Sequence, residues 1–228
     1  ENTSRFGASL SRYFLTDYEF HIESLFQVGS ARQYPNLQCT PGSSCSTSTP
    51  LSASKLHDGI IYPHLLIGGR TQFKDDSTIS IEYYYQADGY SDREFGDFLR
   101  ILTKTRQMNM PATGTSMAPA GGSSGSLPQR FTFDPLRRHY LIASFSKPKI
   151  KDDWTIGTVL IAGLTDLSGT ISPSVTWNTR EWLNLSLYGF IPIRGIPLGQ
   201  VTVNDKNYSE YSLVPIDFRV LFEARAFY

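Results

Sequence analysis

The sequence predicts an all-β fold in which about nine strands form an antiparallel sheet. Apolar and polar residues alternate through nine segments of the 228-residue chain. Most segments are roughly ten residues long, which is within the usual range for strands. Short turns and long connections join them in alternation. A period of two sustained over so many segments indicates antiparallel strands.

Four of these segments lie in the first half of the chain, at 5–14, 19–28, 64–73 and 78–88. Segment 78–88 shows the pattern most clearly, since Ile79 and Ile81 alternate with Ser80 and Glu82. Apolar residues at every second position are expected to share one face of the sheet.

The second half repeats the pattern at 139–148, 154–166, 170–179, 183–193 and 214–228. In the last segment every even position from Val214 to Tyr228 is apolar. The odd positions carry most of its charge, at Asp217, Arg219, Glu223 and Arg225. This segment is predicted to be a two-sided strand.

The connections divide into two kinds. Those near 15–18, 74–77, 149–153 and 179–182 are short and polar, whereas 29–63, 89–138 and 194–213 are long and rich in Gly, Ser, Pro, Asn and Tyr. A helix is predicted at 91–108, because Ser91 and Glu94 have the spacing of a capping box. The apolar residues that follow have helical spacing: Phe95, Phe98, Leu99, Ile101 and Leu102.

Composition excludes several functional classes. Basic and acidic residues balance at 21 each, so a nucleic-acid partner is not expected. No apolar run approaches the roughly 20 residues that a membrane-spanning helix requires. Aromatic residues make up 13% of the chain and charged residues only 18%, a combination compatible with membrane-spanning strands.

The two cysteines, Cys39 and Cys45, lie in the stretch CTPGSSC. Their spacing and the loop composition favour a small disulfide-closed loop over two free thiols, which implies an oxidising compartment such as a bacterial envelope. The residues around them offer no further soft ligands, so no metal site is expected.

The alternating segments, the alternating turns and loops, and the last strand together resemble Gram-negative outer-membrane β-barrel proteins. The resemblance covers nearly the whole chain and implies one transmembrane barrel domain over 1–228, with 29–63, 89–138 and 194–213 as long extracellular loops. It also implies location in the outer membrane, contact with its lipid, and recognition by the barrel-assembly machinery. The residues that resemble the assembly signal are Val220, Phe222, Ala224, Ala226 and Tyr228, with Tyr at the position where Phe is more usual.

In lipid, the strands must close into a barrel with an apolar outer face. The polar positions would then line the interior: Glu19, His21, Glu23, Arg70, Gln72, Glu82, Gln86, Asp217, Arg219, Glu223 and Arg225. Aromatic residues near the short turns would form a girdle at the membrane interface: Phe14, Tyr18, Phe73, Trp154, Trp177, Trp182 and Tyr228. A looser second girdle is expected at the opposite ends, from Tyr62, Tyr90, Tyr140, Tyr208 and Tyr211.

Nine strands are an odd number, whereas single-chain barrels of this class have even numbers. The preferred interpretation is that the chain is the C-terminal part of a larger barrel. A barrel completed by another chain and an additional strand within 31–63 or 120–138 are the alternatives. A soluble β-sandwich or lipocalin-like barrel would show the same alternation.

The leading functional interpretation is a porin-like channel for small solutes, without cofactor or catalytic residues. The first alternative is a structural or docking barrel that binds envelope partners, or further copies of itself, through its loops. The second is an outer-membrane hydrolase, although none of the four histidines lies in a recognisable nucleophile motif. Glu19, His21 and Glu23 could bind a cation or support acid–base chemistry, but a polar wall accounts for them more simply.

Overall fold

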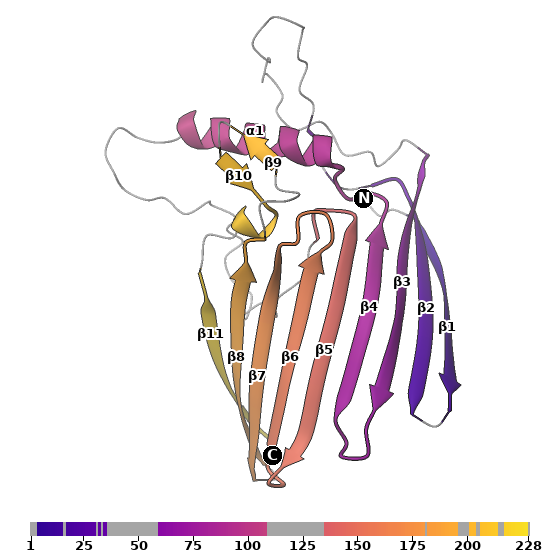
Figure 1. Cartoon of the computed structure of the whole chain (residues 1–228), viewed down its shortest axis with the longest axis vertical. Coiled ribbons are helices and arrows are strands. Elements are labelled where there is room, and N and C mark those ends of the chain that lie inside the picture. Colours follow the sequence, from indigo (N-terminus) through magenta and orange to yellow (C-terminus); the bar gives the residue numbers. More distant parts are fainter. Residues whose placement is uncertain are drawn as a thin grey trace, which may run out of the picture.

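The structure is a computed structural model that describes residues 4–15, 17–30, 32, 34–35, 59–108, 135–180, 182–195, 201–203, 206–213 and 217–227. Nine strands form one antiparallel sheet in the order β1-β2-β3-β4-β5-β6-β7-β8-β11 (Figure 1). Their bounds are β1 Arg5–Phe14, β2 Tyr18–Val28, β3 Ile61–Gln72, β4 Thr78–Gln86, β5 His139–Ile150, β6 Trp154–Gly163, β7 Gly169–Arg180, β8 Leu183–Ile193 and β11 Arg219–Ala226.

The prediction of nine antiparallel strands is confirmed, and the sheet they form is open. Strands β1 and β11 are its two edges among the described residues. The bounds of β1 and β8 agree with the prediction. The last strand is shorter than predicted, since β11 begins at Arg219. Residues 214–216 lie outside the described part of the chain.

Four short connections lie at one end of the sheet, and the long connections begin and end at the other, together with the short connection between β6 and β7 (Figure 1). We call these ends the turn end, where hairpins β1–β2, β3–β4, β5–β6 and β7–β8 close, and the loop end. The loop end carries α1 Asp92–Met108, the two-stranded sheet of β9 Val201–Val203 and β10 Lys206–Tyr208, and the 3₁₀ turn η1 Tyr211–Leu213. Strands β1 and β11 both run from the loop end to the turn end.

Ion pairs join the β3–β4 hairpin to the β5–β6 hairpin at the turn end. Lys147 Nζ lies 2.7 Å from Asp75 Oδ2, and Lys149 Nζ lies 2.9 Å from Asp76 Oδ2. The hydrogen bond from Lys147, together with those from Ser77, holds the pKa of the Asp75 carboxyl well below its usual range. The carboxylate of this turn therefore stays charged throughout the physiological pH range.

The register separates an apolar face of the sheet from a polar face. Residues directly opposite in an antiparallel pair share a face, so Leu10, Ile22, Ile67 and Tyr83 form one row on the apolar face. Every strand contributes to this face, and many of its side chains are exposed: Phe6, Leu10, Phe20, Ile81, Ile156, Ile171, Leu187, Val220 and Phe222 among them.

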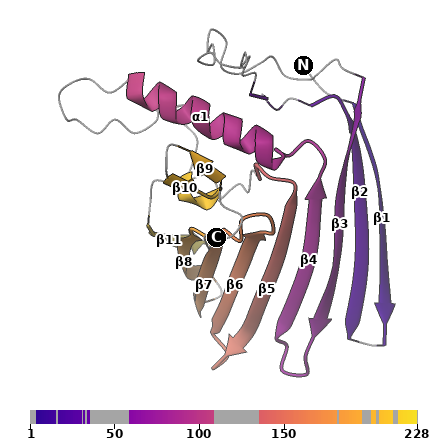
Figure 2. The ribbon, with the colours of Figure 1, turned by 45° about the horizontal axis from the view of Figure 1, so that its top comes forward.

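The hydrophobic core lies at the loop end rather than against the sheet. It consists of Tyr34, Tyr90, Phe95, Leu99 and Val203, and Phe98, Leu136, Tyr208 and Leu213 pack around it. Helix α1 lies across the loop end (Figure 2) and directs its apolar side chains into this cluster. Among the described residues, no helix combines the length and apolar character needed to cross a membrane.

The predicted capping box of α1 is confirmed. The backbone N–H of Ser91 donates to Glu94 Oε2 at 2.8 Å, and the N–H of Glu94 donates back to Ser91 Oγ at 3.4 Å. These bonds satisfy donors that the first helical turn leaves without partners. They fix where the helix starts after β4.

Candidate functional site

The polar face of the sheet brings together almost all the predicted interior residues. By register, the following share this face: Glu19, His21 and Glu23 of β2, Arg70 and Gln72 of β3, Glu82 and Gln86 of β4, and Arg219, Glu223 and Arg225 of β11. Asp217 lies in a bend before β11, where its carboxylate pairs with Arg194. It is therefore part of the loop end and not of the strand.

Contacts between strands that are not neighbours show that the polar face is the concave one. His21 on β2 and Glu82 on β4 both lie opposite Gly68 of β3. His21 Nε2 nevertheless approaches Glu82 Oε1 to 3.7 Å across β3. Side chains of strands two apart converge in this way on the inside of a curved sheet, and Figure 2 shows the curvature.

Gly68 makes this contact possible because it has no side chain. A Cβ at Gly68 would lie 2.5 Å from Glu82 Cγ, 2.9 Å from Ile81 O and 3.0 Å from His21 Nε2. On the opposite face, a Cβ at the adjacent Gly69 would meet only Glu19 O, at 3.4 Å. A Cβ atom is therefore strongly crowded at Gly68 and far less crowded at the neighbouring Gly69.

We therefore expect Gly68→Ala to lower the free energy of unfolding by about 1–3 kcal/mol, the usual cost of forcing extra volume into a filled site. Gly69→Ala is the matched control and should change it by less than about 0.5 kcal/mol. Urea unfolding of the detergent-solubilised protein measures both. Equal effects of the two substitutions would contradict the crowding at Gly68.

Charged side chains on the polar face gather toward the two edges of the sheet. Near one edge Arg70 Nη2 lies 3.3 Å from Glu19 Oε2, and Ser11 donates to Glu19 Oε1 at 2.7 Å. Near the other edge Arg225 Nε donates to Glu223 Oε1 at 2.7 Å. Hydroxyl groups line the strands between them, including Ser80, Ser144, Ser172, Ser174, Thr176 and Ser186. The polar face is therefore mixed in charge at its edges and mostly uncharged between them, where Ile142, Val159 and Ile161 also lie.

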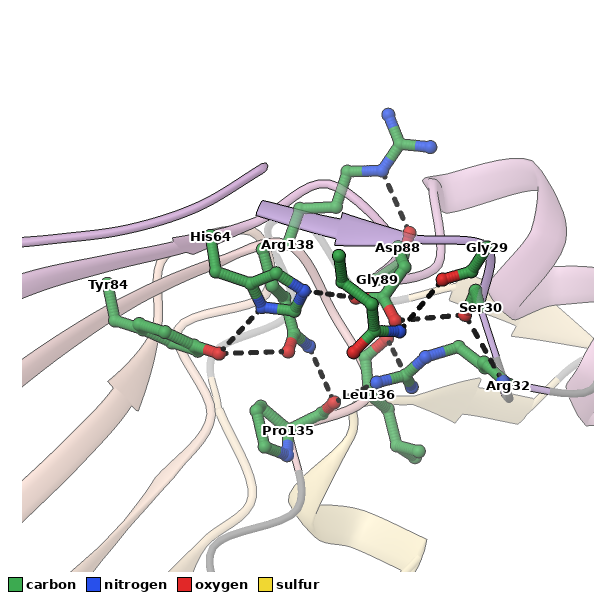
Figure 3. A network of polar contacts seen from close by, with 12 residues as sticks. Gly29, Ser30, Arg32, His64, Tyr84, Asp88, Gly89, Pro135, Leu136 and Arg138 are labelled. Carbon is green, nitrogen blue, oxygen red and sulfur yellow. Dashed lines mark hydrogen bonds and ion pairs between the residues drawn. The ribbon is translucent and has the colours of Figure 1, made fainter. Parts of the chain in front are cut away.

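A polar network at the loop end ties His64 and Tyr84 to the connections above them (Figure 3). His64 Nδ1 lies 3.1 Å from Tyr84 Oη, and His64 Nε2 lies 3.6 Å from Asp88 Oδ1. Ser30 Oγ donates to Asp88 Oδ2 at 2.9 Å. Nearby, Arg32 donates to Pro135 O at 2.8 Å and Arg138 donates to Gly89 O at 2.8 Å.

In a nucleophilic relay the attacking serine or threonine hydroxyl must hydrogen-bond to the imidazole, but the hydroxyl on the imidazole of His64 is the phenol of Tyr84. Here the hydroxyl of Ser30 bonds to the carboxylate, and Ser30 is fully buried. The arrangement instead joins Ser30 and Arg32 to connections 87–89 and 135–138 at the loop end (Figure 3). Its evident role is to hold these connections together.

The connection between β8 and β11 folds back onto the loop end of the sheet. Tyr140 Oη donates to Glu210 Oε2 at 2.6 Å, and the N–H of Leu136 donates to Glu210 Oε1 at 2.8 Å. The N–H of Glu210 donates to Asp166 Oδ2 at 2.7 Å. Burial raises the pKa of the Glu210 carboxyl, and the charge of Asp166 adds to the effect.

This pKa shift predicts a pH-dependent docking of the segment 209–213. Because the folded pKa of Glu210 is raised above its ordinary value of 4.5, its contribution to stability is fully present below that value and is lost as pH rises through the raised pKa. Hydrogen-exchange protection of the Leu136 and Glu210 amides should therefore fall as the pH rises above the ordinary pKa of 4.5. In Glu210→Gln the fall should disappear. A fall of equal size in that variant would contradict the assignment.

Six of the seven predicted girdle residues lie at the turn end and are exposed: Phe14, Tyr18, Phe73, Trp154, Trp177 and Trp182. Trp154 and Trp177 face each other in register, and their rings stack with centroids 5.2 Å apart. Tyr228 lies outside the described residues, whereas Phe227, which the sequence analysis omitted, is exposed beside them.

The second girdle was wrongly assigned. Tyr62, Tyr90, Tyr140 and Tyr211 are buried on the polar side or in the loop-end connections, and Tyr208 packs against the loop-end core. The aromatic side chains on the apolar face near the loop end include the stacked pair Phe6 and Phe26 and also Tyr83 and Tyr85, which have His139 next to them. Tyr83 Oη lies 2.7 Å from His139 Nδ1. The alternation within β4 already places Tyr83 and Tyr85 on the apolar face, so this signal could have identified both residues.

On β11, Val220, Phe222, Ala224 and Ala226 share the apolar face, as predicted for the last strand. Cys39 and Cys45 lie outside the described residues, so the disulfide stays a prediction.

Comparison of the chain with protein-family models, curated proteins and solved structures found no match. The functional argument therefore depends on the arrangement of the side chains alone.

Proposed function

We propose that the nine strands form part of the wall of an outer-membrane β-barrel that acts as a channel for small solutes. One observation carries this proposal: all nine strands place apolar side chains on one exposed face, and all of them except β6 place mainly polar side chains on the other. Each face would then have a suitable solvent, with lipid against the apolar side chains and water against the polar side chains.

A soluble sheet would cover its apolar face with a second layer. Here Leu10 is 67%, Phe222 63% and Leu187 48% exposed, and they belong to a surface that extends across the whole sheet. Soluble monomers rarely expose an apolar patch larger than a few hundred Å². The strands, mostly 9–12 residues long, have the length needed to cross the hydrocarbon layer when tilted.

Closure of the barrel follows from strand direction. Because β1 and β11 run the same way, direct pairing between them would be parallel. An entirely antiparallel barrel requires an odd number of further strands between these edges, and the total is then even, as in most barrels of this class. The proposal therefore includes at least one strand beyond the nine described.

The loop end favours a channel over a docking barrel. A docking helix would present apolar residues outward, whereas Phe95 and Leu99 of α1 are fully buried in the loop-end core. The concave polar face, with charges toward its edges, offers solutes a hydrated surface. Against the hydrolase alternative, the hydroxyl that contacts His64 in this network is the phenol of Tyr84, whereas the serine hydroxyl, Ser30, bonds to Asp88 (Figure 3).

Conductance across planar lipid bilayers tests the channel. The purified, refolded protein should produce discrete current steps, and protein denatured by boiling should produce none. Heat-modifiable gel mobility tests the barrel separately, because folded barrels migrate differently from unfolded chains. A folded, membrane-inserted protein that passes no current above the bare-bilayer level would overturn the channel and leave the barrel in place.

A further inference from the structure

A cavity of about 470 Å³ lies on the polar face of the sheet over β1 to β4. Most of its lining residues belong to two rows of the register on this face, and the row between them contributes Ala8, Ser24 and Leu65. One row runs through Ser9, Glu23, Leu66 and Tyr84. The other, nearer the loop end, contains Gly7, Leu25 and His64.

The cavity exists because β1 contributes very small residues at these rows. Gly7 has no side chain and Ser9 has only a hydroxymethyl group, so the space above them stays open. Leu25 and Leu66 provide an apolar floor. Glu23 and Tyr84 lie on either side of Leu66, since both are directly opposite it in register. Neighbouring strands are about 4.8 Å apart, so the backbones of these two residues are separated by roughly 10 Å.

The two side walls differ in chemistry. Tyr84 is held in place because its hydroxyl lies 3.1 Å from His64 Nδ1 and 3.4 Å from Gln86 Oε1. Its ring is thus a fixed aromatic surface. The carboxylate of Glu23 makes no ion pair with any other described residue, whereas Glu19 pairs with Arg70 and Glu223 pairs with Arg225. A charge without an internal partner is available to a ligand.

We propose that this cavity binds an organic ammonium ion that carries an apolar or aromatic body. The ammonium group would pair with the Glu23 carboxylate, and a cation near Tyr84 gains from the electron-rich face of the ring. The apolar body would cover Leu25 and Leu66. This assignment rests on the proposed channel only in naming a solute class; binding itself does not require that the protein conducts.

Equilibrium binding to the full-length protein, refolded in a neutral detergent, tests the proposal. Three probes of similar size are compared by isothermal titration calorimetry: phenethylammonium, the neutral phenethyl alcohol and the anionic phenylacetate. Phenethylammonium should bind at least tenfold more tightly than either of the others, a difference typical of one well-placed charged contact (roughly tenfold). Titration of the empty micelles corrects for partition of the probes into detergent.

Two pairs of variants locate the site. Glu23→Gln should weaken phenethylammonium binding by roughly tenfold, whereas Glu19→Gln, which removes the same charge from the same face outside the cavity, should change it less than about twofold. Tyr84→Leu should weaken binding about three- to tenfold, and Tyr84→Phe, which keeps the ring, should retain most of it.

Equal binding of the three probes, or unchanged binding in Glu23→Gln, would overturn the proposal. The comparison of probes needs only the wild-type protein, so it remains decisive if a variant fails to fold. Binding without conductance would overturn the channel alone, and conductance without charge-selective binding would overturn this site alone.

Discussion

Leu187→Lys is expected to prevent stable insertion of the sheet into lipid. Leu187 lies near the middle of β8 on the apolar face and is 48% exposed. A lysine on the lipid-facing surface of a barrel costs about 2–4 kcal/mol near the centre of the bilayer. The protein is folded into phospholipid vesicles, and the folded fraction is followed across a urea series by heat-modifiable gel mobility. The midpoint of unfolding should move to a lower urea concentration, and the free energy of unfolding should fall by that amount.

Ser174→Lys is the matched control. Ser174 lies on the adjacent strand β7, opposite Tyr188 in register, and therefore on the polar face. A lysine there would extend into water, so folding into vesicles should stay close to wild type while the current through the protein changes. If Ser174→Lys impairs insertion as much as Leu187→Lys does, the two faces are not lipid and water, and the proposed membrane orientation fails.

The same difference between faces explains why the sheet could be predicted from the sequence. Each strand alternates with a period of two, and this local signal fixes both the strand and the face of each residue. Eight of the nine strands begin within three residues of the predicted positions. The exception is β11, which starts at Arg219 although the alternation extends back to Val214. Alternation shows which residues could be extended, whereas pairing with β8 decides where the strand begins.

The loop end could not be predicted in the same way, because its contacts join residues far apart in the sequence. Tyr140 bonds to Glu210 and Ser30 bonds to Asp88 across 70 and 58 residues. No periodicity in the sequence predicts such contacts. The tyrosines assigned to a second girdle illustrate the difficulty, since Tyr140 is buried beneath the β8–β11 connection and not exposed to lipid.

The cavity over β1 to β4 could be predicted from the sequence only in part. Its polar residue Glu23 was predicted to face the interior, but neither the cavity nor its second wall was predicted. Both depend on the register that places Ser9, Glu23, Leu66 and Tyr84 in one row. A single strand does not contain that information, since a register shift by one residue would place different side chains together.

Asp92→Asn is expected to loosen α1 from the loop end of the sheet. Arg137, just before β5, is only 1% exposed, and its Nη2 pairs with the Asp92 carboxylate in the first turn of α1. Its guanidinium also lies over the ring of Phe95, with Cζ 4.6 Å from the ring centroid. The other guanidinium nitrogens, Nε and Nη1, have no hydrogen-bond partner among the described residues. Asp92 is therefore the carboxylate that hydrogen-bonds to Arg137, and the charge of Glu210 lies near enough to interact with it.

Removing the carboxylate charge takes the charged hydrogen-bond acceptor away from a buried cation, a change that costs about 1–3 kcal/mol. Hydrogen exchange should show that the amides of Phe95 and Leu99 lose protection by that amount, while amides within β4 and β5 keep theirs. Asp97→Asn, on the same helix, is the control, because its pair with Arg100 is exposed and is worth about 0.3–0.5 kcal/mol.

Arg137→Met separates the charge from the volume of this side chain. Methionine would fill much of the same space over Phe95 and would leave no buried cation, so this variant should be less destabilised than Asp92→Asn. If instead Arg137→Met loosens α1 more than Asp92→Asn does, packing over Phe95 and not charge compensation holds the helix in place. The position of α1 over the loop end would then depend on the apolar core around Phe95 and Leu99.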